Sequence, residues 1–407
     1  MKRILIITVF CLAAAGVMAA NPVKKQVRSG EFEREYLVYT PENSRSRPEG
    51  LIVCLHGLNS TMEDFFDGYP IYKIADSLNY LIVAPQALPE QSQSLIDKAA
   101  MISFITGNKL FLRAVWSCGL KVKAVMNLGN ILLLDDELNR QVDDMEFIRL
   151  IIRQTLEEFA LKSENIFMVG TSMGGYMAYQ FALKQPVKLA GMVSIVGSMG
   201  LNIQGMGNGM KVPVCDFHSL TDEVVPYTGS TEQPGITVHL AQPKQDVLRY
   251  WVQTNGAGAP VTENISYYPS TNGITVEKIS YPHPEYEVIH YQINGSNHNY
   301  FFRKEAGDCM DYLEEITKFI TSHASPRSEG IKLLPEQYLA VYPNPAYSRI
   351  YFGVMNGLVS IYDFTGKEML SAPFSAGQLD ISSLKPGTYI ICIRSNGTVR
   401  TAKLIKR

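Results

Sequence analysis

The chain has 407 residues, more than one average domain, so we expect two folded units with short additional segments. Hydrophobic residues make up 46% of the chain and charged residues 19%, which suits a globular protein with a substantial core. The formal net charge of −2, with no basic stripe, argues against general nucleic-acid binding.

Neither a nucleotide cofactor nor a metal ion is expected. No Walker-type or G-x-G-x-x-G loop follows a strand-like run. Of the six cysteines, five follow the first 19 residues, and they show no C-x-x-C spacing and no histidine cluster. We therefore expect free thiols rather than a disulfide framework or a metal site.

The N-terminus reads as a secretory signal peptide. Lys2 and Arg3 precede an apolar run over residues 4–17, and small residues follow at Ala19 and beyond. The run is too short for a transmembrane anchor and lacks a stop-transfer flank. We expect residues 1–19 to be removed during export and no transmembrane anchor to remain.

Up to about residue 322, runs expected to be strands alternate with runs expected to be helices. Several strand runs are apolar throughout, which is typical of a mainly parallel sheet with helices on both faces. The first run, 32–40, alternates apolar and polar residues and is expected at a sheet edge. The other expected strands are 51–55, 81–84, 166–169, 191–196, 212–217 and 287–293, and the expected helices include 71–78, 147–159 and 310–320.

Two segments, 91–139 and 254–284, do not follow this alternation. Both come after strands, on the side of the sheet where open α/β sheets bind substrates. We interpret them as walls of a substrate cleft, with ordinary surface insertions as the alternative.

The most informative stretch is 166–183, IFMVGTSMGGYMAYQFAL. An apolar run leads into Gly170-Thr171-Ser172-Met173-Gly174, a G-x-S-x-G pattern, and a helical pattern follows. Strand, sharp turn and helix are the context in which this pattern forms a nucleophile elbow. Ser172 is the predicted nucleophile; the alternative is a serine that only caps the helix.

A serine nucleophile needs a general base, and His298 is the predicted one. It lies in the glycine-containing loop that follows the last strand, where an α/β-hydrolase places its base. His290 is expected to be a side chain of the sheet, and His56 is expected to have a structural role. A polar loop histidine is the alternative for His298.

The acid that orients the base is predicted to be Asp222. It follows the strand 212–217 by a short turn, and the chain order Ser, Asp, His is the one that this fold requires. Asp216 and Glu223 are competitors, but Asp216 lies in strand register and Glu223 should face away if Asp222 faces inward.

Two backbone N–H groups are needed to stabilise the oxyanion. Met173, directly after the nucleophile at the start of its helix, is expected to supply one. The loop that follows Leu55 is expected to supply the other, with Leu58 as the predicted donor.

The composition and pattern of the sequence change after Ser322. Residues 325–340 read as a polar, proline-bearing linker, which leaves 20–324 as the expected catalytic domain. Residues 341–407 contain short alternating strands separated by turn residues, and are expected to form a small all-β sandwich. The expected strands are 350–352, 358–362, 388–393 and 398–405.

Several motifs occur in one order over about residues 28–322. They are LIVCLHG, VAPQ, VDDMEFI, VGTSMGGYMAYQFA, the Asp222 turn with VPY, and GSNH. Together they resemble polyhydroxybutyrate depolymerase and feruloyl esterase-like α/β-hydrolases, which are secreted esterases. The resemblance implies ester hydrolysis through an acyl-enzyme by Ser172, Asp222 and His298. Asn299-Tyr300 stands where the family usually has Trp-Pro, which leaves the substrate open.

The tail carries VYPNPA, VSIYD and LDISSLKPGTY over nearly its whole length. These motifs resemble the C-terminal sorting domain of type IX secretion. The resemblance implies a partnership with that secretion machinery, export across the outer membrane, and release or surface attachment. A carbohydrate-binding or spacer module is the alternative.

The sequence therefore predicts a secreted serine esterase that acts on carboxylic esters, either acyl or phenolic groups on polysaccharides or polyester-like substrates. A serine peptidase on the same fold is the alternative enzyme. A non-catalytic surface adhesin on a hydrolase scaffold is the alternative of another class, and it would require a triad that does not assemble.

Overall fold

The computed structural model describes residues 22–42, 47–106, 111–201, 207, 209–233, 235–325, 341–352, 356–363, 365–395 and 398–407. It divides into two compact units, Met1–Pro326 and Arg327–Arg407. The expected signal peptide and all but the first residue of the expected linker lie outside the described residues.

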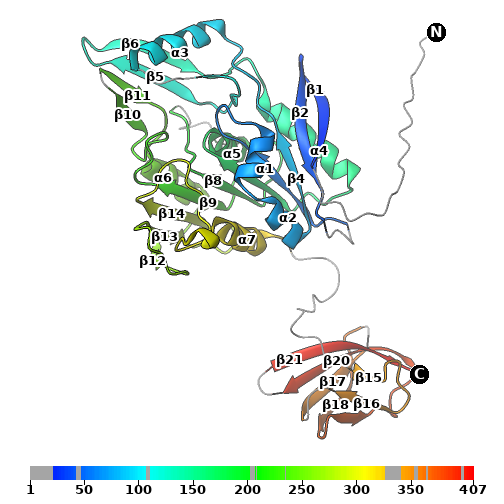
Figure 1. Ribbon diagram of the computed structural model, residues 1–407. Coiled ribbons are helices and arrows are strands. Elements are labelled where there is room, and N and C mark those ends of the chain that lie inside the picture. Colours follow the sequence, from blue (N-terminus) through cyan, green and yellow to red (C-terminus); the bar gives the residue numbers. More distant parts are fainter. Residues whose placement is uncertain are drawn as a thin grey trace, which may run out of the picture. The chain divides into compact units, whose positions relative to one another are not determined.

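A ten-stranded sheet forms the centre of the larger unit (Figure 1). Its six central strands run parallel, and antiparallel strands flank them on both sides, which confirms the expected mainly parallel sheet. In sheet order the strands are β1 (Val23–Ser29), β2 (Phe32–Tyr39), β4 (Tyr80–Pro85), β3 (Gly50–Leu55), β7 (Ile166–Thr171), β8 (Gly191–Ile195), β9 (Val214–Ser219), β14 (Val288–Asn294), β13 (Thr275–Tyr281) and β12 (Val261–Ile265).

Helices cover both faces of this sheet, because its central strands are apolar on both sides. Along β3, Leu51 and Val53 join one core while Ile52 and Cys54 join the other. The first core includes α4 (Asp144–Glu158), α5 (Met173–Lys184) and α6 (Lys244–Asn255), and the second includes α1 (Met62–Gly68), α2 (Tyr72–Leu78) and α7 (Tyr312–His323).

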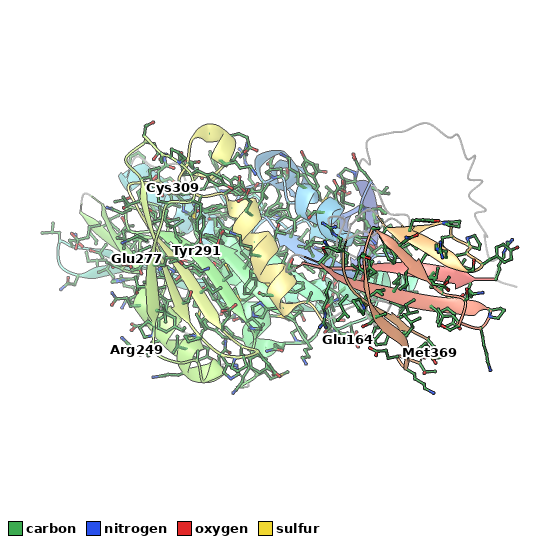
Figure 2. The ribbon with its side chains drawn as sticks, turned by 90° about the horizontal axis from the view of Figure 1, so that it is seen from below. Glu164, Arg249, Glu277, Tyr291, Cys309 and Met369 are labelled. Carbon is green, nitrogen blue, oxygen red and sulfur yellow. The ribbon has the colours of Figure 1, made fainter. Side chains whose placement is uncertain are left out.

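Polar contacts fix α7 on its face of the sheet. Tyr291 of β14, labelled in Figure 2, donates a hydrogen bond from its hydroxyl to Glu315 of α7. The short 3-10 helix η1 (Lys304–Ala306) precedes α7. Asp311 caps α7 by accepting hydrogen bonds from the first N–H groups of the helix.

Two expectations about the sheet are wrong. The run 32–40 does not lie at the edge of the sheet. Its strand, β2, pairs with β1 over residues 32–38, so β1 is the edge strand. Residues 254–284 do not line the cavity described below, because the segment carries β12 and β13, which extend the sheet beyond β14. The antiparallel hairpin adds half-exposed strands, whose weak apolar pattern hides them in the sequence.

A second, smaller sheet belongs to the same unit and is assembled from two distant segments. Its order is β10 (Ser230–Gln233), β11 (Ile236–His239), β5 (Lys121–Met126) and β6 (Ile131–Glu137). Figure 1 shows it beside α3 (Gln93–Thr106) at one end of the unit. We call this sheet and α3 the cap. One segment of the cap, with α3, β5 and β6, comes after β4, and the other, with β10 and β11, comes after β9. Both segments therefore leave the carboxyl ends of parallel strands, where open α/β sheets bind ligands.

The smaller unit consists of two antiparallel sheets, which confirms the expected all-β architecture. Their strands enclose a core that includes Ile350, Val359, Ile361 and Ile391. One sheet contains β15 (Val341–Tyr342), β16 (Arg349–Phe352) and β19 (Gln378–Asp380), and the other contains β18 (Glu368–Phe374), β17 (Gly357–Tyr362), β20 (Gly387–Ser395) and β21 (Thr398–Lys406).

The five cysteines in the described ranges are free thiols, and all except Cys392 are buried. Within the same ranges, no cluster of three or more metal-ligating side chains is found. None of the helices described is both long and apolar enough to cross a bilayer.

Candidate active site

Ser172 occupies the sharp turn between β7 and α5. Its φ of 52° and ψ of −121° are strained for a residue with a Cβ, as expected of a nucleophile elbow. The turn is tight enough to require glycine on both sides: a Cβ on Gly170 would lie 2.1 Å from the Gly174 carbonyl oxygen, and one on Gly174 would lie 2.0 Å from the Leu55 oxygen. Although Ser172 is at the N-cap position, its hydroxyl does not cap the helix.

The predicted base reaches this serine. His298 lies in the loop after β14, and its Nε2 is 2.9 Å from the Ser172 hydroxyl oxygen. Its Nδ1 lies 2.7 Å and 3.0 Å from the two carboxylate oxygens of Asp222. The three predicted residues, separated by up to 126 positions in the chain, therefore form one continuous hydrogen-bonded row.

Asp222 is held rigidly in its turn after β9. Its Oδ1 accepts hydrogen bonds from the N–H groups of Val224, at 2.9 Å, and Val225, at 2.8 Å. Burial alone would raise the pKa of the Asp222 carboxyl, but the hydrogen bond and charge of His298, with smaller contributions from His218 and Val225, lower it. An ionised Asp222 accepts the Nδ1 proton of His298, which leaves the Nε2 lone pair facing Ser172.

His218 also supports this turn, a role that the sequence did not reveal. Its Nε2 is 2.8 Å from the Val225 carbonyl oxygen and its Nδ1 is 3.0 Å from the Gly197 carbonyl oxygen. Burial, followed by the charge of Lys244, lowers the pKa of His218. Its position at the end of β9, four residues before Asp222, is the signal that could have indicated this role.

The competing acids lie elsewhere. Asp216, within β9, accepts hydrogen bonds from Lys244 (2.9 Å), Tyr179 (2.9 Å) and His290 (2.8 Å). Burial would raise the pKa of Asp216, but Lys244 and His290 outweigh it and lower the pKa. The side chain of Glu223 is exposed. His290 is a sheet side chain as predicted, but it is part of this buried charged network.

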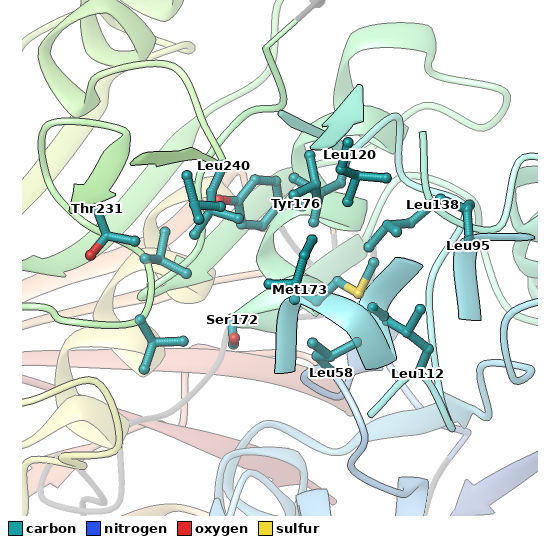
Figure 3. Close-up of a pocket in the computed structure, with 17 residues that line it drawn as sticks. Leu58, Leu95, Leu112, Leu120, Leu138, Ser172, Met173, Tyr176, Thr231 and Leu240 are labelled. Carbon is teal, nitrogen blue, oxygen red and sulfur yellow. The ribbon is translucent and has the colours of Figure 1, made fainter. Parts of the chain in front are cut away.

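The two predicted oxyanion donors flank Ser172. Figure 3 shows Met173 and Leu58 next to it. Met173 begins α5, where N–H groups have no partner within the helix, and no acceptor for the Leu58 N–H is found among the described residues. A Cβ on Gly57 would lie 3.2 Å from the Ser172 Cβ, so the loop passes close to the nucleophile.

His56 holds that loop in place, as expected of a structural residue. Its Nε2 accepts a hydrogen bond from the Ala87 N–H at 3.1 Å, so the ring proton sits on Nδ1 and is donated to the Gly57 carbonyl at 2.8 Å. Trp116 donates its indole N–H to the His56 carbonyl at 2.8 Å. Burial lowers the pKa of His56 to about 4, so the ring stays neutral near pH 7 and keeps a single proton, on Nδ1.

A cavity of about 270 Å³ opens beside Ser172, between the elbow and the cap (Figure 3). Segment 91–139 supplies eight of its lining residues, so the segment predicted to form a wall of the substrate cleft does line a cavity beside Ser172. The lining residues are Leu58, Leu95, Ala99, Ile102, Leu112, Leu120, Val122, Leu134, Leu138, Ser172, Met173, Tyr176, Val224, Val225, Thr231, Val238 and Leu240.

Two segments of the chain match known families. Residues 133–236 match the family described as phospholipase/carboxylesterase, a segment that contains Ser172 and Asp222 and ends before His298. Residues 340–407 match the secretion system C-terminal sorting domain. These matches confirm the predicted class of enzyme, a serine hydrolase of carboxylic esters, and the predicted sorting domain. The narrower resemblance to polyhydroxybutyrate depolymerases and feruloyl esterases stays a prediction.

Solved structures that are similar include three hydrolases. An acetyl xylan esterase from Aspergillus awamori is 14% identical, with a TM-score of 0.46 over 74% of this chain and 99% of its own. An S-formylglutathione hydrolase from Agrobacterium tumefaciens is 10% identical, with a TM-score of 0.45 over 76% and 98%. An acylaminoacyl peptidase from Pyrococcus horikoshii is 14% identical, with a TM-score of 0.43 over 78% and 43%. No curated protein sequence matches the chain.

Proposed function

We propose that the protein hydrolyses carboxylic esters through an acyl-enzyme formed on Ser172. The observation that carries this proposal is the hydrogen-bonded row from Asp222 through His298 to the Ser172 hydroxyl, at 2.7 Å and 2.9 Å. Such a row is what a serine nucleophile needs to lose its proton as it attacks.

In the proposed first half-reaction, the Ser172 oxygen attacks the ester carbonyl carbon while His298 Nε2 takes the hydroxyl proton. The N–H groups of Met173 and Leu58 stabilise the negative oxygen of the tetrahedral intermediate. His298 then gives its proton to the departing alcohol oxygen as the bond between carbon and that oxygen breaks. Asp222 stays ionised and stabilises the imidazolium.

In the second half-reaction, water takes the place of the alcohol. His298 removes a proton from the water as its oxygen attacks the acyl carbon, and returns that proton to Ser172 as the acyl group leaves as a carboxylic acid. Each half-reaction starts and ends with a neutral imidazole, so the site is regenerated after every turnover.

The proposal also includes export of the protein from the cell. The sorting domain at residues 340–407 supports recognition by the type IX secretion machinery, and therefore a place at the cell surface or outside the cell. Esters on polysaccharides or polyester-like substrates are what an enzyme in that place would meet, and polysaccharide hydroxyl groups are the alcohols that we propose on this ground.

The alternatives differ in what they require of the site. If the protein were a non-catalytic adhesin on this scaffold, the serine would be expected to lie out of reach of any histidine. The Ser172–His298 distance is instead that of a hydrogen bond. A peptidase would use the same row of residues on an amide, so only the choice of substrate separates it from an esterase.

Hydrolysis of a panel by the mature protein and by Ser172→Ala tests the proposal. The panel contains p-nitrophenyl acetate and butyrate, methyl ferulate, acetylated xylan and a peptide anilide. We expect ester turnover that falls by roughly 10³-fold or more in the variant. Turnover of the peptide alone would support the peptidase, and wild-type turnover no better than the variant's on every substrate would contradict both enzymes.

A further inference from the structure

The position of the cavity relative to the proposed triad tells which half of an ester it can hold. In the tetrahedral intermediate the oxyanion faces the N–H groups of Leu58 and Met173, and the alcohol oxygen must face His298, which protonates it. The acyl substituent occupies the remaining direction. Ser172, Leu58 and Met173 line the cavity and His298 does not, so the cavity lies on the acyl side.

The chemistry of the cavity wall is uniform. Fourteen of its seventeen lining residues are alanine, valine, leucine, isoleucine or methionine, and none of the seventeen is charged. Apart from Ser172 itself, the polar atoms available from side chains are the hydroxyl groups of Thr231 and Tyr176. Such a wall would leave a charged or sugar-like acyl group without the hydrogen bonds that it makes in water.

The volume sets the size of the occupant. An apolar cavity of about 150 Å³ holds one benzene molecule, with six carbon atoms, so 270 Å³ has room for about ten carbon atoms. An acetyl group would leave most of this space empty. Figure 3 shows Leu95 and Leu138 beyond Met173 as seen from Ser172, so the space continues past the oxyanion donors toward the cap.

We propose that this cavity binds the aliphatic acyl chain of the ester, with an optimum at about eight to ten carbon atoms. The inference rests on the proposed function and assigns the substrate class of the same site. The cap determines chain length, because the inner face of α3 supplies the wall residues Leu95, Ala99 and Ile102.

Two adjacent alanines of α3 provide a matched pair of variants. Ala99 is 3% exposed and lines the cavity, whereas Ala100 is exposed on the outer side of the same helix. Phenylalanine at either position changes helix propensity equally. Only at position 99 does the added ring enter the cavity, where it would fill more than half of the space.

The experiment measures kcat/KM of the mature chain on p-nitrophenyl esters from acetate to palmitate, below their aggregation concentrations, with methyl ferulate included. For the wild type, each added methylene is expected to raise kcat/KM by up to about fourfold until octanoate or decanoate. Palmitate should be poorer, because its chain exceeds the cavity. Ala99→Phe should lower the ratio of octanoate to acetate turnover at least tenfold, and Ala100→Phe should keep the wild-type profile.

A second variant covers the case in which Ala99→Phe does not fold. Ile102→Ala enlarges the same cavity, and it should move the optimum to longer chains. Acetate or methyl ferulate as the best substrate of the wild type would overturn the inference, as would identical profiles for Ala99→Phe and Ala100→Phe. These outcomes leave ester hydrolysis intact, whereas failure of the proposed function would show as no turnover of any ester that depends on Ser172.

Discussion

The ring of His218 lies against the turn that carries the proposed acid, with its Nε2 2.8 Å from the carbonyl oxygen of Val225. The N–H of the same Val225 donates to Asp222 at 2.8 Å. Val225 is thus held from both sides of its backbone, and its side chain lines the cavity beside Ser172. One residue therefore links the proposed acid, a buried histidine and the cavity.

We expect His218→Leu to lower kcat by about 10- to 100-fold, because the turn without its His218–Val225 contact positions the Asp222 carboxylate less well. The acid limb of the kcat/KM profile should also move to lower pH, because a displaced Asp222 stabilises the imidazolium form of His298 less. His283→Leu is the control, because the His283 ring accepts hydrogen bonds from the N–H groups of Glu285 and Tyr286, outside the Asp222 turn. A stability loss with an unchanged pH profile would contradict a positioning role.

Asp222 and Asp216, which are both buried, should respond differently to loss of charge. Asp222→Asn should lower kcat by roughly 10³- to 10⁴-fold, because an amide cannot stabilise the imidazolium or favour the required tautomer. Asp216→Asn should instead lower the free energy of unfolding by about 3–5 kcal/mol, because Lys244 loses its buried partner. Denaturant titration and steady-state kinetics separate the two effects, and a larger loss of kcat in Asp216→Asn would show that the acid is misassigned.

Acidification should destabilise the larger unit through the buried His56. The pKa of His56 is about 4 in the folded chain, below the value of about 6.5 in an unfolded one. The unfolded state therefore binds more protons between these values, so this contribution to stability is complete above about pH 6.5 and is lost as the pH falls toward 4. His56 contributes up to about 3 kcal/mol to the free energy of unfolding.

Urea unfolding at about pH 7 and about pH 4.5 measures this loss. Protonation of His56 is unfavourable in the folded chain because a second ring proton, on Nε2, would face the N–H of Ala87. His56→Gln should show a weaker pH dependence of the free energy of unfolding than the wild type. Equal pH dependence in both proteins would contradict the assigned tautomer.

Local patterns made the elbow and the order of the proposed triad predictable. The glycines around Ser172 mark a turn in which a Cβ has no room, and this constraint acts within a few residues. The turn at Asp222 and the loop at His298 each follow an apolar strand, so their place at one edge of the sheet follows from parallel topology.

Long-range pairings were less predictable. The strand β1 has the polar sequence VKKQVRS, and only its pairing with β2 makes it a strand. The cap sheet joins β5 to β11, which lie more than 100 residues apart, and no local pattern specifies that register. His218 stayed hidden for the same reason, because its partners Gly197 and Val225 come from different loops.

Covalent trapping of the nucleophile tests the central claim most directly. A fluorophosphonate reacts with a serine that an adjacent base activates and leaves a stable phosphonyl group on its oxygen. Peptide mass spectrometry of the labelled protein should find one adduct, on Ser172, and His298→Ala should slow its formation by several orders of magnitude. Labelling of a different serine, or a Ser172 that stays unlabelled in the folded protein, would contradict the account.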